Sequence, residues 1–195
     1  MADLLATPPD LASLLQRDLN TMDPASLTLV LEISTGFVQA AAEQRLVEVV
    51  NDQVTVYGDS DRLLRLPERP VMAVTSVTYQ GSALTQGTAS GTWRLAHHGI
   101  WRDCGWPATD WCAPSPVDVV YSHGYPDGHQ KLQPARGSTL SLARTPFINP
   151  DGTVREQIDD YAVAYEAVAA AFEASPAMRA TLRRIYGERA RFVKI

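Results

Sequence analysis

The segment Val71-Met-Ala-Val-Thr-Ser-Val-Thr-Tyr79 consists mainly of β-branched and aromatic residues, which is typical of a β-strand. Shorter segments of the same kind lie on both sides of it, and Gly and Pro residues separate them. These segments are 53–57, 62–66, 93–95 and 117–121. The stretch from Gly99 to Pro116 is rich in Trp, Pro and Gly and is expected to be a loop. Residues 47–125 are therefore predicted to form an antiparallel β-rich block.

Helical periodicity flanks this block on both sides. Leu11, Leu14 and Leu15 share a helical spacing behind the Thr7-Pro8-Pro9 start signal. A second helix is expected from Asp23 to about Leu46. Two more are expected from Pro134 to Arg144, weakened by Gly137, and from Ser175 to a stop at Gly187. The β block is thus inserted between two helical segments.

The segment Ile158–Tyr165 alternates like a strand, whereas the overlapping 162–174 is alanine-rich enough to form a helix. Periodicity does not decide between these two structures. The predicted fold class is α+β: a small bundle of about four helices, an inserted antiparallel block and an extended tail. Its parts are the N-terminal helices 1–46, the β block 47–125, the C-terminal helices 126–187 with a strand or hairpin near 158–165, and the tail 188–195.

The carboxyl end differs in charge from the rest of the chain. Residues 176–195 contain six basic side chains and one acid, so the segment carries +5 although the whole chain carries −5. Its last part, Glu188-Arg-Ala-Arg-Phe-Val-Lys-Ile195, alternates like a strand but has no following segment to pair with. One interpretation is a tail that docks on another subunit; the other is a frayed, solvated terminus. The docking residues would be Arg189, Arg191, Phe192, Val193, Lys194 and Ile195, with a basic face on the last helix made by Arg179, Arg183 and Arg184.

Composition argues against several classes of protein. An acidic pI of about 5.3 is unlike that of general nucleic-acid binders. No apolar run is expected to be long enough to cross a bilayer, and the acidic N-terminus is unlike a signal peptide. Cys104 and Cys112 are expected to be free thiols, although a disulfide between them is possible.

Residues capable of catalysis or metal binding are present, but their spacing is unfavourable. The zinc candidates lack the short paired spacing of known sites; they are His97, His98, Cys104, Cys112, His123 and His129. Ser122 and His123 are adjacent on a predicted strand, so their side chains diverge and a triad with Asp118 is not favoured. The pair Asp159-Asp160 is interpreted as a solvated turn. No catalytic, cofactor or metal residue is predicted.

The four Trp residues are candidates for stacking sugars or bases. Few basic residues lie near them in the sequence, and nucleic-acid binding would need such residues. A role in the core or as interface anchors is therefore favoured for Trp93, Trp101, Trp106 and Trp111.

The order of the motifs resembles the head–tail connector (adaptor) proteins of long-tailed bacteriophages. The resemblance is carried by the opening Leu5–Leu15, the end of the second helix Val38–Leu46, and the strand pair Arg62–Val77 with its Leu-Pro-Glu-Arg-Pro-Val centre. It continues in Val117–Tyr125, which ends in His-Gly-Tyr, and in Ile158–Tyr165, where Asp159 replaces the usual glycine. Gly137 and Ser138 depart from the family's aliphatic third helix, and the loop 99–116 is longer than is typical.

This resemblance implies a structural virion protein and not an enzyme. It implies a homo-oligomeric ring, usually of twelve copies, that sits below the portal at the neck of the virion after assembly in the host cytoplasm. The ring would extend the channel for double-stranded DNA without binding DNA specifically, and would contact the portal and the next connector or tail protein, with no membrane and no cofactor. Two alternatives remain: a metal-dependent or hydrolytic enzyme using the His, Cys and Ser residues, and a DNA-binding regulator using the last helix.

Overall fold

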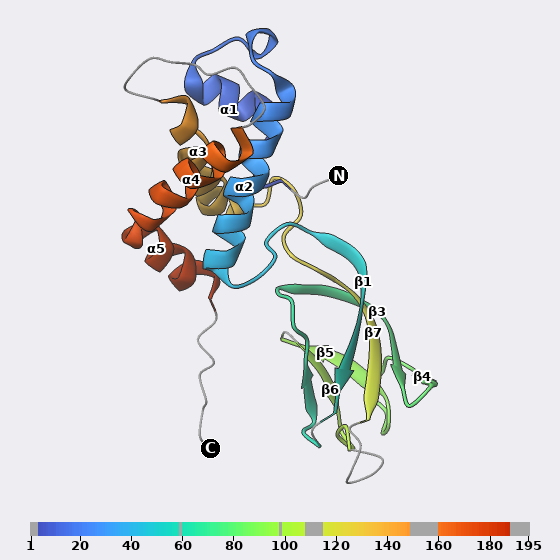
Figure 1. Cartoon of the computed structure of the whole chain (residues 1–195). Coiled ribbons are helices and arrows are strands. Elements are labelled where there is room, and N and C mark those ends of the chain that lie inside the picture. The colour runs from blue at the N-terminus through green and yellow to red at the C-terminus, as the bar shows by residue number, and fades with distance from the viewer. Residues whose placement is uncertain (1–3, 59, 98, 108–114, 149–159, 188–195) are drawn as a thin grey trace. The chain divides into compact units, whose positions relative to one another are not determined.

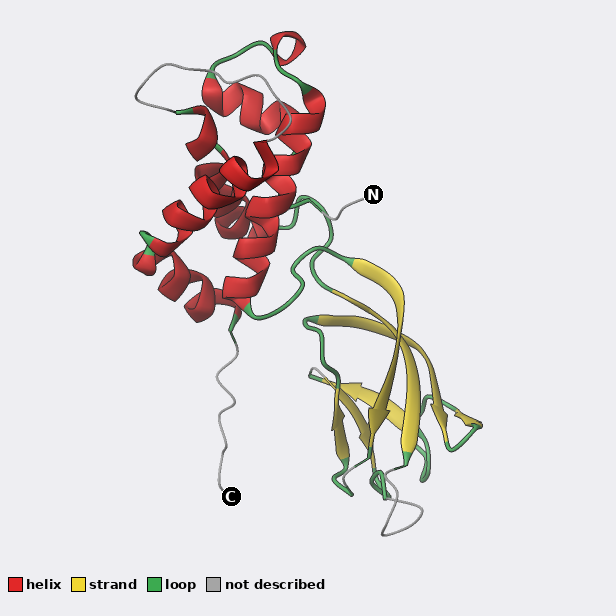
Figure 2. Ribbon diagram, in the orientation of Figure 1, coloured by secondary structure: helices red, strands yellow, loops and turns green. Residues whose placement is uncertain are grey.

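The computed structural model describes residues 4–58, 60–97, 99–107, 115–148 and 160–187. The chain divides into two compact units, one made by Met1–Val47 with Asp127–Ile195 and the other by Glu48–Pro126. The first unit is helical and the second is built from two antiparallel sheets (Figure 1, Figure 2). The mixed α+β class predicted from the sequence is therefore confirmed.

The helical unit is organised around its longest helix, α2. The elements of the unit are α1 (Pro8–Leu15), η1 (Leu19–Thr21), α2 (Pro24–Ala42), η2 (Gln130–Leu132), α3 (Gln133–Ala143), η3 (Thr145–Phe147), α4 (Asp160–Glu173) and α5 (Pro176–Tyr186). Helix α2 contacts each of the other four α-helices. Its buried face includes Leu27, Leu31 and Val38, which are fully shielded from solvent. Burial of these large apolar side chains provides most of the driving force for packing the unit.

Local signals explain where the first two helices begin. The Asp10 carboxylate accepts hydrogen bonds from the backbone N–H and the hydroxyl of Thr7, at 2.9 and 2.6 Å, at the start of α1. The Asp23 carboxylate accepts from the backbone N–H groups of Ala25 and Ser26 at the start of α2. These side chains satisfy helix N–H groups or neighbouring donors that have no intrahelical acceptor. Helix α2 ends at Ala42, earlier than expected, because Glu43 adopts a left-handed conformation with φ of 58°.

Two expectations for the helical unit were wrong. The strand or hairpin predicted near 158–165 is wrong from Asp160 onward, and the alternative of a helix over 162–174 is confirmed by α4. This helix raises the number of α-helices among the described residues to five; 158 and 159 lie outside the described residues. Alanine has the highest helix propensity of all residues, and the alanine-rich sequence outweighs the short alternation of Val and Tyr. By length and composition α2 is also apolar enough to cross a membrane, contrary to expectation. Half of it is buried inside the unit, as in the core helix of a globular protein.

An ion pair between Asp10 and Arg136 joins α1 to α3, with 2.6 Å between Asp10 Oδ1 and Arg136 Nη2. Burial alone would raise the pKa of the Asp10 carboxyl, but the hydrogen bonds from Thr7 and the Arg136 guanidinium lower the pKa below its ordinary value of 3.8. The folded state therefore favours the ionised form. Its contribution to stability is complete above the unfolded pKa and is lost as the pH falls through the lower, folded pKa.

We predict that Asp10→Asn reduces the acid sensitivity of the helical unit. Between about pH 6 and about pH 3 the variant should lose less unfolding free energy than the parent chain, because it no longer carries this linked proton. Urea unfolding at both pH values measures the difference. Glu32→Gln, at an exposed acid of α2, is the control and should retain the full parental loss. An Asp10→Asn variant with the parental pH dependence would contradict this assignment.

The described residues of the β unit form seven strands in two sheets. The strands are β1 (Val49–Tyr57), β2 (Leu63–Arg65), β3 (Val71–Tyr79), β4 (Ser82–Leu84), β5 (Trp93–Ala96), β6 (Gly99–Arg102) and β7 (Pro116–His123). One sheet has the order β1-β7-β3-β4 and the other has the order β2-β6-β5. All strand pairs in both sheets are antiparallel.

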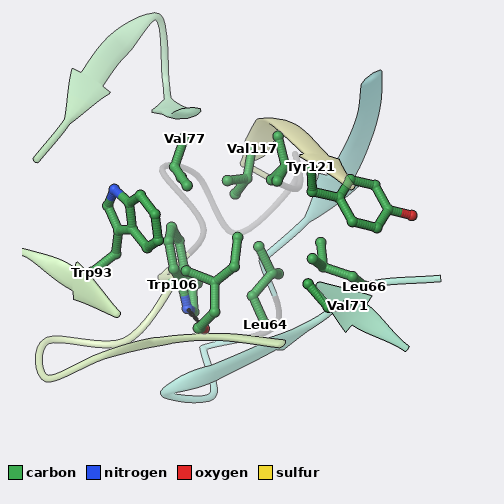
Figure 3. Packing of buried hydrophobic residues seen from close by; sticks show 10 residues of the cluster. Leu64, Leu66, Val71, Val77, Trp93, Trp106, Val117 and Tyr121 are labelled. Carbon is green, nitrogen blue, oxygen red and sulfur yellow. Dashed lines mark hydrogen bonds between the residues drawn. The ribbon is translucent and has the colours of Figure 1, made fainter. Parts of the chain in front are cut away.

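The inward side chains of both sheets form one apolar core (Figure 3). Trp93 and Trp106 are buried in it, and their indole N–H groups donate to backbone carbonyls. The Trp106 segment lies so close to Gly58 that a Cβ atom there would collide with the Trp106 carbonyl oxygen. Of the two roles predicted for the Trp residues, core or interface anchor, the core role is confirmed for Trp93 and Trp106. Trp111 lies outside the described residues.

The prediction of a loop from Gly99 to Pro116 is wrong for its first residues, because Gly99–Arg102 form β6. This strand lies between β2 and β5 and pairs with both. A Cβ atom at Gly99 would lie 2.5 Å from the Leu64 carbonyl oxygen, so glycine allows the close approach of the two strands. The sequence Gly-Ile-Trp-Arg is too short to show alternation, and its structure depends on partners that are distant in the sequence.

Candidate docking site at the end of the helical unit

The carboxyl end of α5 is fixed to the rest of the helical unit by Leu182 and Tyr186. Both side chains are buried. The Tyr186 hydroxyl donates to the Lys131 carbonyl and accepts the backbone N–H of Ala135 at 3.3 Å. These two bonds connect the last turn of α5 to η2 and the start of α3. The carboxyl end of α5 is therefore held in place.

Gly187 ends α5 with an extended conformation, φ of −68° and ψ of 104°. Its N–H donates to the Arg183 carbonyl at 2.8 Å, and a Cβ atom at this position would lie 2.5 Å from the same oxygen. A glycine therefore allows the turn to close while the chain leaves the helix. The predicted docking tail, Arg189, Arg191, Phe192, Val193, Lys194 and Ile195, lies outside the described residues.

The predicted basic face of α5 is partly neutralised by ion pairs. Arg179 Nη1 lies 3.1 Å from Glu173 Oε2, and its guanidinium carbon lies 5.4 Å from the centre of the Phe172 ring. Arg183 Nε lies 3.4 Å from Glu43 Oε1 on α2. Such exposed pairs contribute little to stability, so a stronger partner can displace them.

Arg184 is exposed and makes no ion pair within the described parts of the chain. Since each residue of an α-helix turns about 100° around the axis, Arg184 does not share the side occupied by Arg179 and Arg183. The three residues therefore form two basic sides of α5.

We predict that Tyr186→Phe destabilises the helical unit by about 1–3 kcal/mol, because the Lys131 carbonyl in η2 and the Ala135 N–H in the first turn of α3 lose the hydroxyl that both contact. Urea unfolding followed by far-UV circular dichroism measures the change. Tyr57→Phe, at a residue that is 59% exposed, should have no measurable effect. A Tyr186→Phe variant as stable as the parent would show that α5 is held by apolar packing alone.

The suggested hydrolase residues are not brought together. Ser122 Oγ accepts the backbone N–H of Asn51 at 3.2 Å, and Asp118 accepts the Thr55 hydroxyl at 2.6 Å. His123 is buried, with its Nε2 atom 3.1 Å from Asp52 Oδ2. Each member of the suggested triad thus has a different neighbour.

The His123–Asp52 pair depends on an irregularity in β1, where the register with β7 shifts between Val49 and Asp52 and Asn51 has φ of 56°. A sequence pattern does not reveal such a shift.

The suggested metal ligands are also dispersed. Within the described ranges no three His, Cys, Asp or Glu side chains are placed to hold a metal ion. Cys104 is exposed and free, and His129 instead accepts the backbone N–H of Lys131 at the start of η2. His98, Cys112 and Asp159 lie outside the described residues, and Asp160 begins α4.

Comparison with known proteins gives a distant structural neighbour. No protein-family model and no curated protein matches the chain. A matching solved chain comes from a structure described as the neck of an empty GTA particle computed with C6 symmetry. It is 16% identical, with a TM-score of 0.43, and the match covers 77% of this chain and 79% of the other.

Proposed function

We propose that this chain is a structural virion protein that forms a head-to-tail adaptor ring below the portal. The ring extends the DNA channel and links the capsid vertex to the tail or to the next connector. The order of motifs along almost the whole sequence supports this role, and so does the insertion of a β unit between two parts of a helical unit. The role is structural and not catalytic.

The observation that carries the proposal is the fixed end of α5. Tyr186 holds the last turn against η2 and α3, and Gly187 then directs the chain away from the helix. The eight residues that follow contain three basic side chains and alternate like a strand. A short segment with basic and apolar side chains that follows a firmly held helix end is suited to docking on a neighbouring protein.

In this proposal the tail pairs with a strand of the portal, and main-chain hydrogen bonds provide affinity. Phe192, Val193 and Ile195 fill apolar pockets, while Arg189, Arg191 and Lys194 meet acidic side chains. Arg184, which has no ion-pair partner in the described structure, extends this basic surface onto α5. Each tail can bind weakly, because all the tails of a ring engage the portal together.

Charge reversal in the tail tests this proposal. The triple variant Arg189→Glu, Arg191→Glu, Lys194→Glu should lose co-sedimentation with purified portal, while the parent chain should bind more weakly as salt is raised. Arg144→Glu, at an exposed residue after α3, is the charge control and should bind as the parent does.

Undiminished binding by the triple variant would refute the tail assignment. If the parent chain instead bound duplex DNA and lost that binding when Arg183 and Arg184 were replaced by Ala, the regulator alternative would hold.

A further inference from the structure

The two sheets of the β unit differ in charge. Strands β2, β5 and β6 contain three Arg residues and no Asp or Glu. Strands β1, β3, β4 and β7 contain two Asp residues, Asp52 and Asp118, and no Lys or Arg. Because the two sheets share one core between them, their outer faces point in opposite directions (Figure 3). Arg102 and Asp52 lie on the core side of their sheets, opposite Trp93 and Tyr121. The charged strand residues of the outer faces are therefore Arg65 and Arg94 on one sheet and Asp118 on the other.

The basic face belongs to the β2-β6-β5 sheet. Leu64, Ile100 and Trp93 point into the core, so the residues that alternate with them point outward. Leu63, Trp101 and Arg94 are cross-strand neighbours on this outer face, and Arg65 lies further along it. The Arg94 guanidinium carbon lies 4.0 Å from the centre of the Trp101 ring.

Stacking on the Trp101 ring restricts the Arg94 guanidinium to one position before any partner binds. Its N–H donors meet no carboxylate within the described residues, and the same is true of exposed Arg65. A guanidinium held on an aromatic ring loses less rotamer freedom when it binds an acid. Trp, Tyr and Arg are also the residues most enriched in the energetic centres of protein interfaces.

The acidic face belongs to the β1-β7-β3-β4 sheet. Val117 and Val119 of β7 point into the core, so Asp118 points outward, where its cross-strand neighbours are Thr55 and Thr78. Asp118 accepts a hydrogen bond from Thr55 but has no ion-pair partner in the described structure. Tyr57 lies on the same side of β1 and is 59% exposed. The outer face of this sheet thus carries a carboxylate that has no ion-pair partner among the described residues, and an exposed aromatic ring.

We infer that the basic outer face of one copy docks against the acidic outer face of the next copy, with Arg94 paired to Asp118. A contact between two different faces of the same molecule is heterologous, and repetition of such contacts closes into a ring when the rotation permits. Trp101 and Tyr57 contribute aromatic contact beside the charged pair. This inference rests on the proposed ring function and assigns a lateral contact within that ring.

Charge exchange tests the pairing. Arg94→Glu and Asp118→Lys are each expected to weaken self-association of the full-length chain about tenfold or more, as measured by analytical ultracentrifugation. The double variant carries both reversals on every copy, so its self-association should return to within about threefold of the parent value. Both residues are exposed, and circular dichroism verifies that each variant is folded. Arg17→Glu, at an exposed Arg of the helical unit, reproduces the change in net charge and should leave self-association unchanged.

Three results would overturn the inference: a parent chain that remains monomeric at the highest concentration measured, a single reversal without effect, and a double variant weaker than both single variants. Portal co-sedimentation separates this inference from the proposed function, since that assay depends on the tail. If the chain binds the portal but the double variant does not recover self-association, only the lateral pairing is refuted. If the double variant recovers self-association but the parent chain does not bind the portal, only the adaptor assignment is refuted.

Discussion

A chain that lacks residues 188–195 is expected to remain folded but to fail to join DNA-filled heads. The deletion leaves the buried Leu182 and Tyr186, which fix α5 to the rest of the helical unit, in place. It does remove all six tail residues proposed to reach the portal. Complementation of a particle without its own copy of the protein measures the loss, and circular dichroism of the purified chain verifies that folding is retained. Normal head completion by the truncated chain would contradict the tail assignment.

A proline substitution separates strand pairing from charge attraction in the same tail. Val193→Pro keeps every charge but removes one backbone N–H and fixes φ, so it should weaken docking if the tail pairs as a strand. Val193→Ala is the matched control and should retain most of the binding. Equal binding by the Pro and Ala variants would show that charge alone holds the tail.

The substitution Trp106→Ala is expected to cost the β unit about 3–5 kcal/mol of stability, because it removes a large, fully buried aromatic ring. The indole N–H donates to the carbonyls of Arg62 and Ile100, each at 3.2 Å, and the ring packs edge-on against Tyr79 with 5.8 Å between centroids. Hydrogen exchange of the β7 amides measures the loss within this unit without requiring that the whole chain unfolds in one step.

Trp101→Ala is the matched control for Trp106→Ala, since Trp101 is only half-buried on the outer face. Loss of its contact with Arg94 should cost about 1 kcal/mol. If the two substitutions had similar effects, Trp106 would not be the main support of this core.

Much of the fold could be predicted because its signals are local. The capping positions Thr7 and Asp23 and the long β-branched segment at 71–79 predicted elements that the structure contains. Strand β6 could not be predicted, since Gly99–Arg102 becomes a strand only between β2 and β5. Helix α4 was ambiguous because its sequence satisfies two periodicities in a short segment.

The candidate site shows the same division between local and long-range information. Gly187 was predicted as a helix stop from its residue type and position. The anchor formed by Tyr186 was not predicted, because its partners Lys131 and Ala135 are more than fifty residues away in the sequence. The ion pairs that neutralise Arg179 and Arg183 depend in the same way on tertiary packing and on the turn between α4 and α5. The sequence indicates Asp118 only as a possible member of a catalytic triad. Its place on the outer face of the β1-β7-β3-β4 sheet depends on strand pairing and could not be predicted.

We propose that this chain is a structural ring component at the neck of a virion, attached through its carboxyl end. Electron cryo-microscopy of native particles tests it most directly. We expect both units of the chain to fit a ring of density directly below the portal, with residues 188–195 as an added strand on a portal sheet. Neck density that neither unit fits, or a well-defined ring whose carboxyl ends point away from the portal, would contradict it.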